Sequence, residues 1–277
     1  MFLCECFFFN FVCEHEFKNM NKKVIVITGG AGVLGTEISS HFIKKGHVVC
    51  VIEKNNKSII QHDRLISYIS DVTSPEILKI TAKEIYKKFG KIDVLINAAG
   101  GNHPDATISD DKTIFDLDFN AFNKVTDINL NGTVISCIVF GELMVKNKTG
   151  GSIINYSSMS VERTLTRVVA YSASKAGVQN FTRWLAVELS LKFEGKVRVN
   201  AISPGFFLGK QNMHLLINED GSYTERAKRI IDLTPMKRFG EPEDLNGVIE
   251  FLCAESSKFI TGAVIPIDGG FSAFSGV

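Results

Sequence analysis

Three side chains with a fixed spacing suggest the chemistry of this chain. Tyr171 and Lys175 lie four positions apart, which places both on one face of a helix. A neighbouring ammonium favours the phenolate, so the pair predicts a tyrosine with a lowered pKa that exchanges a proton with a reacting oxygen. Ser158 lies thirteen positions before Tyr171, just after an apolar run, where its hydroxyl can hold a carbonyl oxygen. The three predict a carbonyl reductase or alcohol dehydrogenase, in which Lys175 can also hold a nicotinamide ribose.

Each of these residues also has an ordinary explanation. Amphipathic helices often carry a surface tyrosine and lysine, and strands often end at a serine. The prediction therefore depends on all three lying in register with a nucleotide-binding turn.

Such a turn occurs near the start of the chain. The string TGGAGVLG (28–35) follows an apolar β-branched run and opens a helical pattern. Glycines let the backbone approach a pyrophosphate, which the N–H groups at a helix N-terminus bind. The position between strand and helix favours a dinucleotide site over an ordinary tight turn. The candidate cofactor-binding residues of this turn are Gly29, Gly32, Val33, Leu34 and Gly35.

Acidic residues after the next two strands indicate which dinucleotide binds. Glu53 ends the second apolar run, where a carboxylate accepts the ribose hydroxyls of NAD and repels the 2′-phosphate of NADP. Lys54 beside it weakens that exclusion, so we expect NAD and leave NADP open. Asp71 and Val72 follow the third run and are expected near the adenine, although Asp71 can equally be a solvated helix cap.

The order of elements predicts a single α/β domain with a doubly wound parallel sheet of the Rossmann type. From Lys23 onward, short apolar runs alternate with amphipathic helical stretches, as in sheets covered on both faces. Residues 206–240 break this rhythm and are expected to form an inserted, partly helical segment within a domain spanning residues 20–277. The expected strands are Val24–Thr28, His47–Glu53, Leu65–Ser70, Val94–Asn97, Ser152–Tyr156, Val197–Ile202 and Val264–Ile267. The expected helices are Leu34–Lys45, Pro75–Phe89, Phe119–Val145, Tyr171–Phe193 and Pro242–Leu252.

Composition excludes several classes of protein. The 277 residues include 31 Lys and Arg against 30 Asp and Glu, so the chain has no global basic field for nucleic acid or an anionic membrane. Hydrophobic residues make up 45% of the chain, which excludes a wholly disordered protein. Its apolar runs are too short to span a membrane.

The six cysteines show no disulfide framework, which predicts a reducing, cytoplasmic location. The spacing of Cys4, Cys6 and Cys13 does not fit a structural zinc site, so we expect no metal.

The first nineteen residues differ from the rest. Their Phe-rich run is interrupted by Glu5 and lacks the basic start of a secretory signal. Met20 leads through two lysines directly into the first strand. We therefore expect Met20 to be the true start and residues 1–19 to be a poorly ordered extension.

These features together resemble the short-chain dehydrogenase/reductase family. The strings TGGAGVLG (28–35), NAAG (97–100), NLNG (129–132), YSASK (171–175) and PG (204–205) occur in the family's order and spacing over residues 23–277. The resemblance implies a catalytic set of Asn129, Ser158, Tyr171 and Lys175. It also implies further cofactor contacts from Asn97, Ala98, Gly100, Pro204 and Gly205. Asn129 disfavours a regular helix, which predicts a kink or a water-holding role there.

Two positions depart from the family pattern. Val33 stands where the family usually has its middle glycine, and Gly32 lies one place earlier. Gly209 stands where the family often has a threonine that contacts the nicotinamide amide. The detail of the pyrophosphate turn and the amide contact are therefore open.

Loop sequences resemble a sugar-acid branch of this family, the D-mannonate oxidoreductases or fructuronate reductases. The strings include GGNHP (100–104), FDLDF (115–119), SPGFFLGKQN (203–212), DGSYTERAKRII (220–231), TPMKRFGEPEDL (234–245) and DGGFSAFSGV (268–277). The resemblance implies hydride transfer between a nicotinamide and C5 of a six-carbon keto-uronate. The specific expectation is interconversion of D-fructuronate and D-mannonate with NAD.

Polar residues in these regions are the candidates for binding a small sugar acid. Asn102 and His103 follow the fourth strand, and His103 can bond a sugar hydroxyl or simply lie on the surface. Arg163 and Arg167 lie on the segment between the catalytic serine and tyrosine, and a guanidinium suits a carboxylate, although both can be solvated charges. Asn212 in the insert carries an amide suited to a polyol.

Three other functions stay open at this point. They are a different polyol or sugar-acid dehydrogenase of the gluconate type, a ketoreductase of acyl-carrier substrates, and a non-catalytic nucleotide-binding regulator. A regulator would be free to lose Ser158, Tyr171 or Lys175, and all three are present.

The apolar segment 270–277 can dock on a neighbouring subunit, as in tetrameric relatives. We therefore expect a homo-oligomer, a tetramer or a dimer.

Overall fold

A parallel sheet forms the centre of the molecule. The computed structural model describes residues 22–55, 61–209 and 213–276, and within these ranges seven strands form one sheet in the order β3-β2-β1-β4-β5-β6-β7. Each neighbouring pair is parallel. The strands are β1 (Val24–Thr28), β2 (Val48–Glu53), β3 (Leu65–Ile69), β4 (Val94–Asn97), β5 (Gly151–Tyr156), β6 (Val197–Pro204) and β7 (Val264–Ile267). The predicted strands are confirmed to within two residues at each end.

The strand order reverses next to β1. The chain builds outward from β1 to β3 and then returns to place β4 on the other side of β1. At such a reversal the connections leave toward opposite faces, so a crevice opens at the carboxyl ends of β1 and β4. The predicted doubly wound fold is confirmed.

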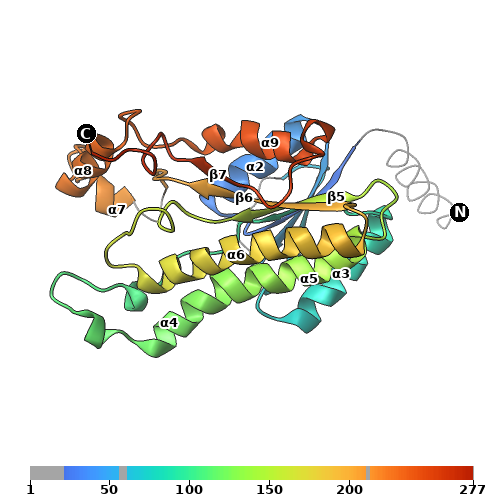
Figure 1. Ribbon diagram of the computed structural model, residues 1–277, viewed down its shortest axis with the longest axis horizontal. Helices are drawn as coiled ribbons and strands as arrows, with labels where there is room; N and C mark the ends of the chain where they lie inside the picture. The colour runs from blue at the N-terminus through green and yellow to red at the C-terminus, as the bar shows by residue number, and fades with distance from the viewer. Residues whose placement is uncertain (1–21, 56–60, 210–212, 277) are drawn as a thin grey trace, which may run out of the picture.

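Helices cover both faces of the sheet (Figure 1). One face carries α3 (Pro75–Phe89), α5 (Gly132–Met144) and α6 (Val169–Lys192), whose apolar side chains pack with Val26, Leu95 and Ile153 of the strands. The other face carries α2 (Val33–Lys44) and α9 (Asn246–Cys253), which pack on alternate strand residues such as Ile25, Ile96 and Ile154. The central strands are apolar on both faces because both faces are buried, whereas the edge strands β3 and β7 are partly exposed.

The helix expected over Phe119–Val145 is interrupted in the middle. It consists of α4 (Phe119–Thr126), a π-helical turn η3 (Asp127–Asn131) and α5. Asn129 lies in that turn, and its side-chain amide donates to the carbonyl of Val125 at 2.8 Å and to that of Gly101 at 2.7 Å. The irregularity expected at Asn129 is therefore found, and its side chain bonds both the preceding helical turn and the loop after β4.

Short helices complete the chain around the carboxyl edge of the sheet. After β4 come η1 (Pro104–Ala106) and η2 (Ile114–Asp116), and after β6 come α7 (Met213–Leu216) and α8 (Glu225–Leu233). The last unit begins with η4 (Pro242–Leu245) and has η5 (Glu255–Ser257) after α9. The segment 206–240 has its own small apolar cluster, formed by Leu216, Ala227, Ile230 and Phe239.

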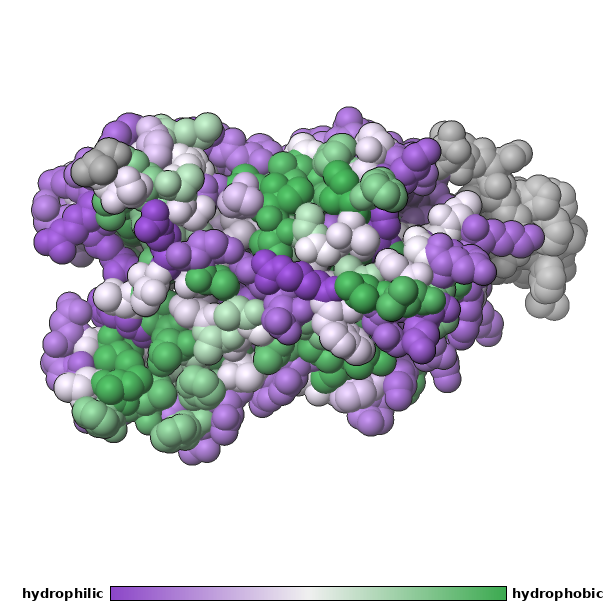
Figure 2. Space-filling view, in the orientation of Figure 1, coloured by the Kyte–Doolittle hydropathy of each residue, from purple (hydrophilic) through white to green (hydrophobic). Residues whose placement is uncertain are grey.

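Apolar side chains gather on the surface where the chain leads into α4, at the lower left of Figure 2. Ile114, Phe115 and Phe119 are exposed there, Phe115 by 94%. None of the described helices is long and apolar enough to cross a membrane. The expected extension, residues 1–19, lies outside the described residues.

Candidate functional site

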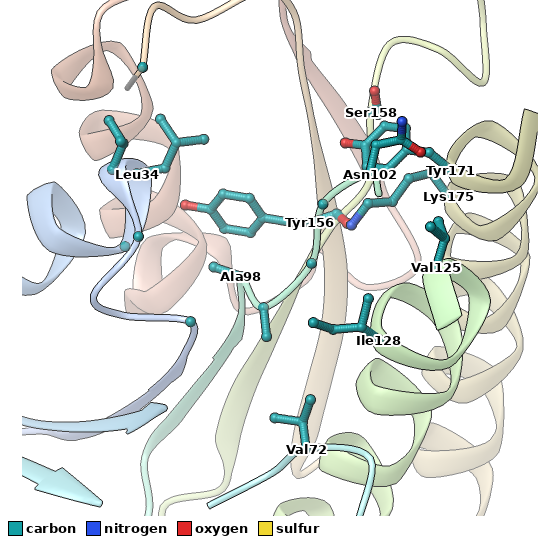
Figure 3. Close-up of a pocket in the computed structure, with 18 of the residues that line it drawn as sticks. Leu34, Val72, Ala98, Asn102, Val125, Ile128, Tyr156, Ser158, Tyr171 and Lys175 are labelled. Carbon is teal, nitrogen blue, oxygen red and sulfur yellow. The ribbon is translucent and has the colours of Figure 1, made fainter. Parts of the chain in front are cut away.

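A cavity of about 1070 Å³ lies at the carboxyl edge of the sheet. Its wall runs from the glycine-rich turn after β1, past the ends of β2, β3 and β4, to the ends of β5 and β6. Figure 3 shows Ser158, Tyr171 and Lys175 together on one side and Leu34 of the glycine-rich turn on the other. The predicted nucleotide turn and the predicted catalytic trio therefore face one space.

Close packing explains the glycines of the turn. Gly29 adopts φ +70°, and a Cβ placed there would lie 2.7 Å from Cα of Ala99. A Cβ on Gly35 would lie 2.3 Å from the carbonyl oxygen of Gly29. The N-cap Gly32 supplies no side-chain acceptor, so no side chain caps the first turn of α2. These features fit a turn that binds an anion through its backbone N–H groups.

The end of β2 has a buried carboxylate. Glu53 is only 7% exposed, and its Oε1 accepts a hydrogen bond of 2.6 Å from the Ala31 N–H of the glycine-rich turn. The carboxylate therefore braces the turn and also lines the cavity, where it can accept a ribose hydroxyl.

Lys54 and Asp71 form an ion pair on the same wall, with Nζ and Oδ2 2.7 Å apart. Partial burial acts to raise the pKa of Asp71, but hydrogen bonds from Lys54 and Thr73 outweigh it and hold the pKa below its usual value. Asp71 also accepts the Thr73 N–H, but the N-cap of α3 is Ser74, so Asp71 is a cavity residue and not the helix cap that the sequence left open. Val72 beside it lines the cavity.

Two buried hydroxyls on the wall have no protein partner. Among the described residues, Ser70 Oγ and the Tyr156 hydroxyl are buried without a hydrogen bond, and both residues line the cavity. An unpaired buried hydroxyl costs on the order of 1–3 kcal/mol. The volume of the cavity and the uncapped helix N-terminus fit a polar, dinucleotide-sized ligand.

Lys175 is buried at the other end of the cavity. Its Nζ donates a 2.7 Å hydrogen bond to the carbonyl oxygen of Tyr156, the last residue of β5. Burial lowers the pKa of Lys175 to about 8. Its Nζ lies 5.6 Å from the ring centroid of Tyr171, so the side chains lie on one helix face as predicted.

The pKa of Tyr171 shifts in the direction opposite to the sequence prediction. Burial raises it, and a hydrogen bond with Ser158 lowers it only in part. The prediction of a net lowering by Lys175 is wrong for this structure, because desolvation of the phenol dominates and the ammonium is directed to the Tyr156 carbonyl. The Ser158–Tyr171 contact does bring two of the predicted catalytic residues together.

Asn129 lies beneath the loop after β4 that lines the cavity. It is fully buried and is not among the lining residues; its Oδ1 accepts the Gly101 N–H at 3.1 Å. A Cβ on Gly100 would lie 2.5 Å from this Oδ1 and 3.4 Å from Nζ of Lys175. Asn129 therefore positions the loop after β4 against Lys175.

Asn97, expected to contact the cofactor, does not line the cavity, and its side chain is engaged elsewhere. The side chain points into the sheet–helix layer and donates to Oδ1 of Asn155 at 2.9 Å, and Asn155 in turn donates to Thr182. Its strand neighbours Ala98 and Gly100 line the cavity, as do Pro204 and Gly205 at the end of β6.

The two arginines lie outside the cavity. Arg163 donates to the carbonyl oxygens of Ser272 at 3.0 Å and Phe274 at 2.5 Å, so its guanidinium holds the C-terminal segment of its own chain. The prediction that Arg163 binds substrate directly is therefore wrong. Arg167 has φ +77°, and its buried Nε has no partner among the described residues, but Arg167 does not line the cavity either.

The other substrate candidates divide into two groups. Asn102 and His103 line the cavity as expected. Asn102 donates to Thr107 Oγ1 at 2.8 Å, and His103 Nδ1 accepts the Asp105 N–H. Asn212 lies outside the described residues.

Several lining residues were missed in the sequence. Tyr156 ends β5, and its ring extends toward Leu34 (Figure 3). Lys124 and Ile128 lie one turn apart on the helix that carries Asn129, a signal that was available from helical spacing. The segment Phe206–Gly209 follows the PG pair and closes the wall.

Comparison with known proteins agrees with this architecture. A family described as enoyl-(acyl carrier protein) reductase matches residues 29–272. The chain is a short-chain dehydrogenase/reductase. Its sequence is 42% identical over 281 residues to the uncharacterized oxidoreductase UxuB of Bacillus subtilis. The aligned region covers 95% of this chain and 99% of that relative.

Solved structures of the family are also similar. A crystal structure from Haemophilus influenza with bound NAD, provisionally named a D-mannonate oxidoreductase, is 38% identical with a TM-score of 0.84 and covers 94% of this chain and 99% of that one. The structure of the aldohexose dehydrogenase of Thermoplasma acidophilum is 25% identical with a TM-score of 0.80. The match covers 92% of this chain and 96% of that one.

The buried lysine gives a test of the site through stability. The pKa of Lys175 is about 8 in the folded chain and ~10.4 in the unfolded chain. Between these two pH values the unfolded chain still holds the proton that the folded chain has released, so the free energy of unfolding rises with pH. Lys175→Met lacks this titration. We expect the free energy of unfolding of wild type minus variant to rise by about 1–3 kcal/mol from pH 7 to pH 10, measured by urea denaturation. A difference that stays flat with pH would show that Lys175 is solvated.

Proposed function

We propose that the protein is an NAD(H)-dependent oxidoreductase that interconverts a keto-uronate and its hydroxy acid, most specifically D-fructuronate and D-mannonate. The observation that carries the reaction class is the Ser158–Tyr171–Lys175 cluster at one end of a dinucleotide-sized cavity. The choice of a sugar acid is supported by the loop strings and by the similarity to the Haemophilus structure with bound NAD.

The residues present fit the cofactor along the whole wall. The uncapped turn at Gly32 would hold the pyrophosphate, Glu53 the adenosine ribose, and Lys175 the nicotinamide ribose. When bound, the nicotinamide supplies or accepts the hydride.

Tyr171 serves as the acid in the direction of reduction. Its hydroxyl gives its proton to the carbonyl oxygen as the carbonyl carbon receives the hydride, and the phenolate that remains lies near the Lys175 ammonium. Ser158 holds the same oxygen, and its hydrogen bond to Tyr171 aligns donor and acceptor. In the direction of oxidation the phenolate takes the proton back.

The carboxylate of a uronate needs a cation on the cavity wall. Lys54 is paired with Asp71, and Lys175 belongs to the proposed catalytic cluster. The Nδ1 atom of His103 lies 3.5 Å from Oδ2 of Asp105. Of the described basic residues that line the cavity, Lys124 is the remaining one. Its side chain is exposed and lines the cavity, so we assign the carboxylate to Lys124 in place of the two arginines.

Removing the Lys124 charge tests this assignment. Hydrogen bonds to charged groups are worth ~1.5–3 kcal/mol, so Lys124→Met should lower kcat/KM for D-fructuronate by roughly ten- to 150-fold. A neutral keto-sugar of equal length should be affected less than about threefold. Lys112→Met, an exposed lysine off the cavity wall, is the matched control. Equal losses on both substrates would exclude a carboxylate contact.

Cofactor choice is tested at Glu53 without breaking the turn. Glu53→Gln keeps an acceptor for the Ala31 N–H but removes the charge that repels a 2′-phosphate. The ratio of the NADPH and NADH dissociation constants should fall by roughly tenfold in fluorescence titrations. A wild type that already prefers NADPH would contradict the proposed role of Glu53.

The reaction itself is tested with a substrate panel. Purified enzyme should oxidise NADH fastest with D-fructuronate, compared with tagaturonate, 5-ketogluconate and an acetoacetyl thioester. Tyr171→Phe should lower turnover by roughly 10²–10⁴-fold while NADH still binds, because the variant loses only the acidic hydroxyl. Preference for 5-ketogluconate or the thioester would favour the gluconate-type or acyl-carrier alternative. Near-normal turnover in the variant would refute the mechanism.

A further inference from the structure

The glycine-rich turn and the segment after β6 meet across the cavity at two residues. Val33 is the first residue of α2, and Gly209 lies at the end of the segment Phe206–Gly209; both line the cavity. A Cβ placed on Gly209 would lie 3.4 Å from Cγ2 of Val33 and 3.7 Å from its Cβ and Cγ1. The Val33 side chain is therefore within van der Waals contact of the position where a side chain at residue 209 would begin.

These residues are also the two departures from the family pattern. The pattern has a glycine in the turn and a side chain at position 209, whereas this chain has a side chain in the turn and a glycine at position 209. An alanine at 209 would make an ordinary van der Waals contact with Val33. A threonine extends further from Cβ, and its additional atoms would compete with Val33 for the same space.

We propose that Val33 and Gly209 are one coupled pair that sets the width of the dinucleotide cavity between the glycine-rich turn and the segment after β6. The proposal rests on the proposed NAD(H) cofactor and not on the choice of sugar acid. In this arrangement an apolar side chain from the glycine-rich turn takes the place of a side chain at position 209, and the dinucleotide is held there by shape rather than by a hydroxyl at position 209.

Neither partner can move away easily. Val33 lies within the turn in which Gly35 packs on Gly29, so this packing constrains its backbone. The carbonyl oxygen of Gly209 accepts the Met213 N–H at 3.0 Å, which is the start of α7. A larger residue at 209 would therefore displace α7 or narrow the cavity, and either change would weaken binding of the dinucleotide.

A double-mutant cycle on NADH binding tests the pair. The dissociation constant is measured by fluorescence titration, with no second substrate, for wild type, Val33→Gly, Gly209→Thr and the double variant. We expect Gly209→Thr to weaken NADH binding about tenfold. The double variant should return to within about threefold of wild type, because the glycine makes room for the threonine. Gly209→Ala is the control and should stay within about twofold.

The outcomes separate the pair from the general function. Additive losses, or a double variant weaker than Gly209→Thr, would overturn the coupling while leaving the proposed oxidoreductase intact. A wild type that does not bind NADH would overturn both. Melting temperatures of all five proteins distinguish a loss of cofactor contact from unfolding, since rescue of affinity at an unchanged melting temperature is expected only from the pair.

Discussion

The buried hydrogen bond between Lys175 and the Tyr156 carbonyl is the contact on which the site depends. An ammonium placed in the interior needs a strong acceptor, and the end of β5 provides one at 2.7 Å. This bond fixes α6 against the end of β5. Because Tyr171 lies one turn before Lys175 and Ser158 lies two residues after Tyr156, the same bond sets where the acid and the oxygen-holding hydroxyl meet. Asn129 reaches the same point from the opposite side by holding the loop after β4.

Much of the fold and the catalytic cluster could be predicted because local sequence determines them. Apolar β-branched runs buried on both faces gave strand positions to within two residues, and helical spacing placed Tyr171 and Lys175 together. The glycines of the turn were predictable because any side chain there would collide with backbone. Even the break in the long helix had a local sign in Asn129.

What could not be predicted depends on contacts between distant segments. The guanidinium of Arg163 could bind a carboxylate, but it donates its hydrogen bonds to the carbonyl oxygens of Ser272 and Phe274, more than a hundred positions away in the sequence. Asn97 stands at a strand end, yet strand alternation turns its side chain away from the cavity and toward Asn155. The pKa of Tyr171 followed burial rather than its charged neighbour, because burial is a property of the whole fold and not of helical spacing.

The small apolar cluster within the 206–240 segment has an evolutionary consequence. Leu216, Ala227, Ile230 and Phe239 pack with one another, separately from the two large clusters that hold the sheet. Substitutions in this cluster change the local stability of the 206–240 segment and leave the two sheet cores unchanged. Because the lining residues Phe206 and Leu208 pack on this cluster, a lineage could reshape that part of the cavity by changing the cluster and leave the sheet cores intact, which makes the segment a module for divergence.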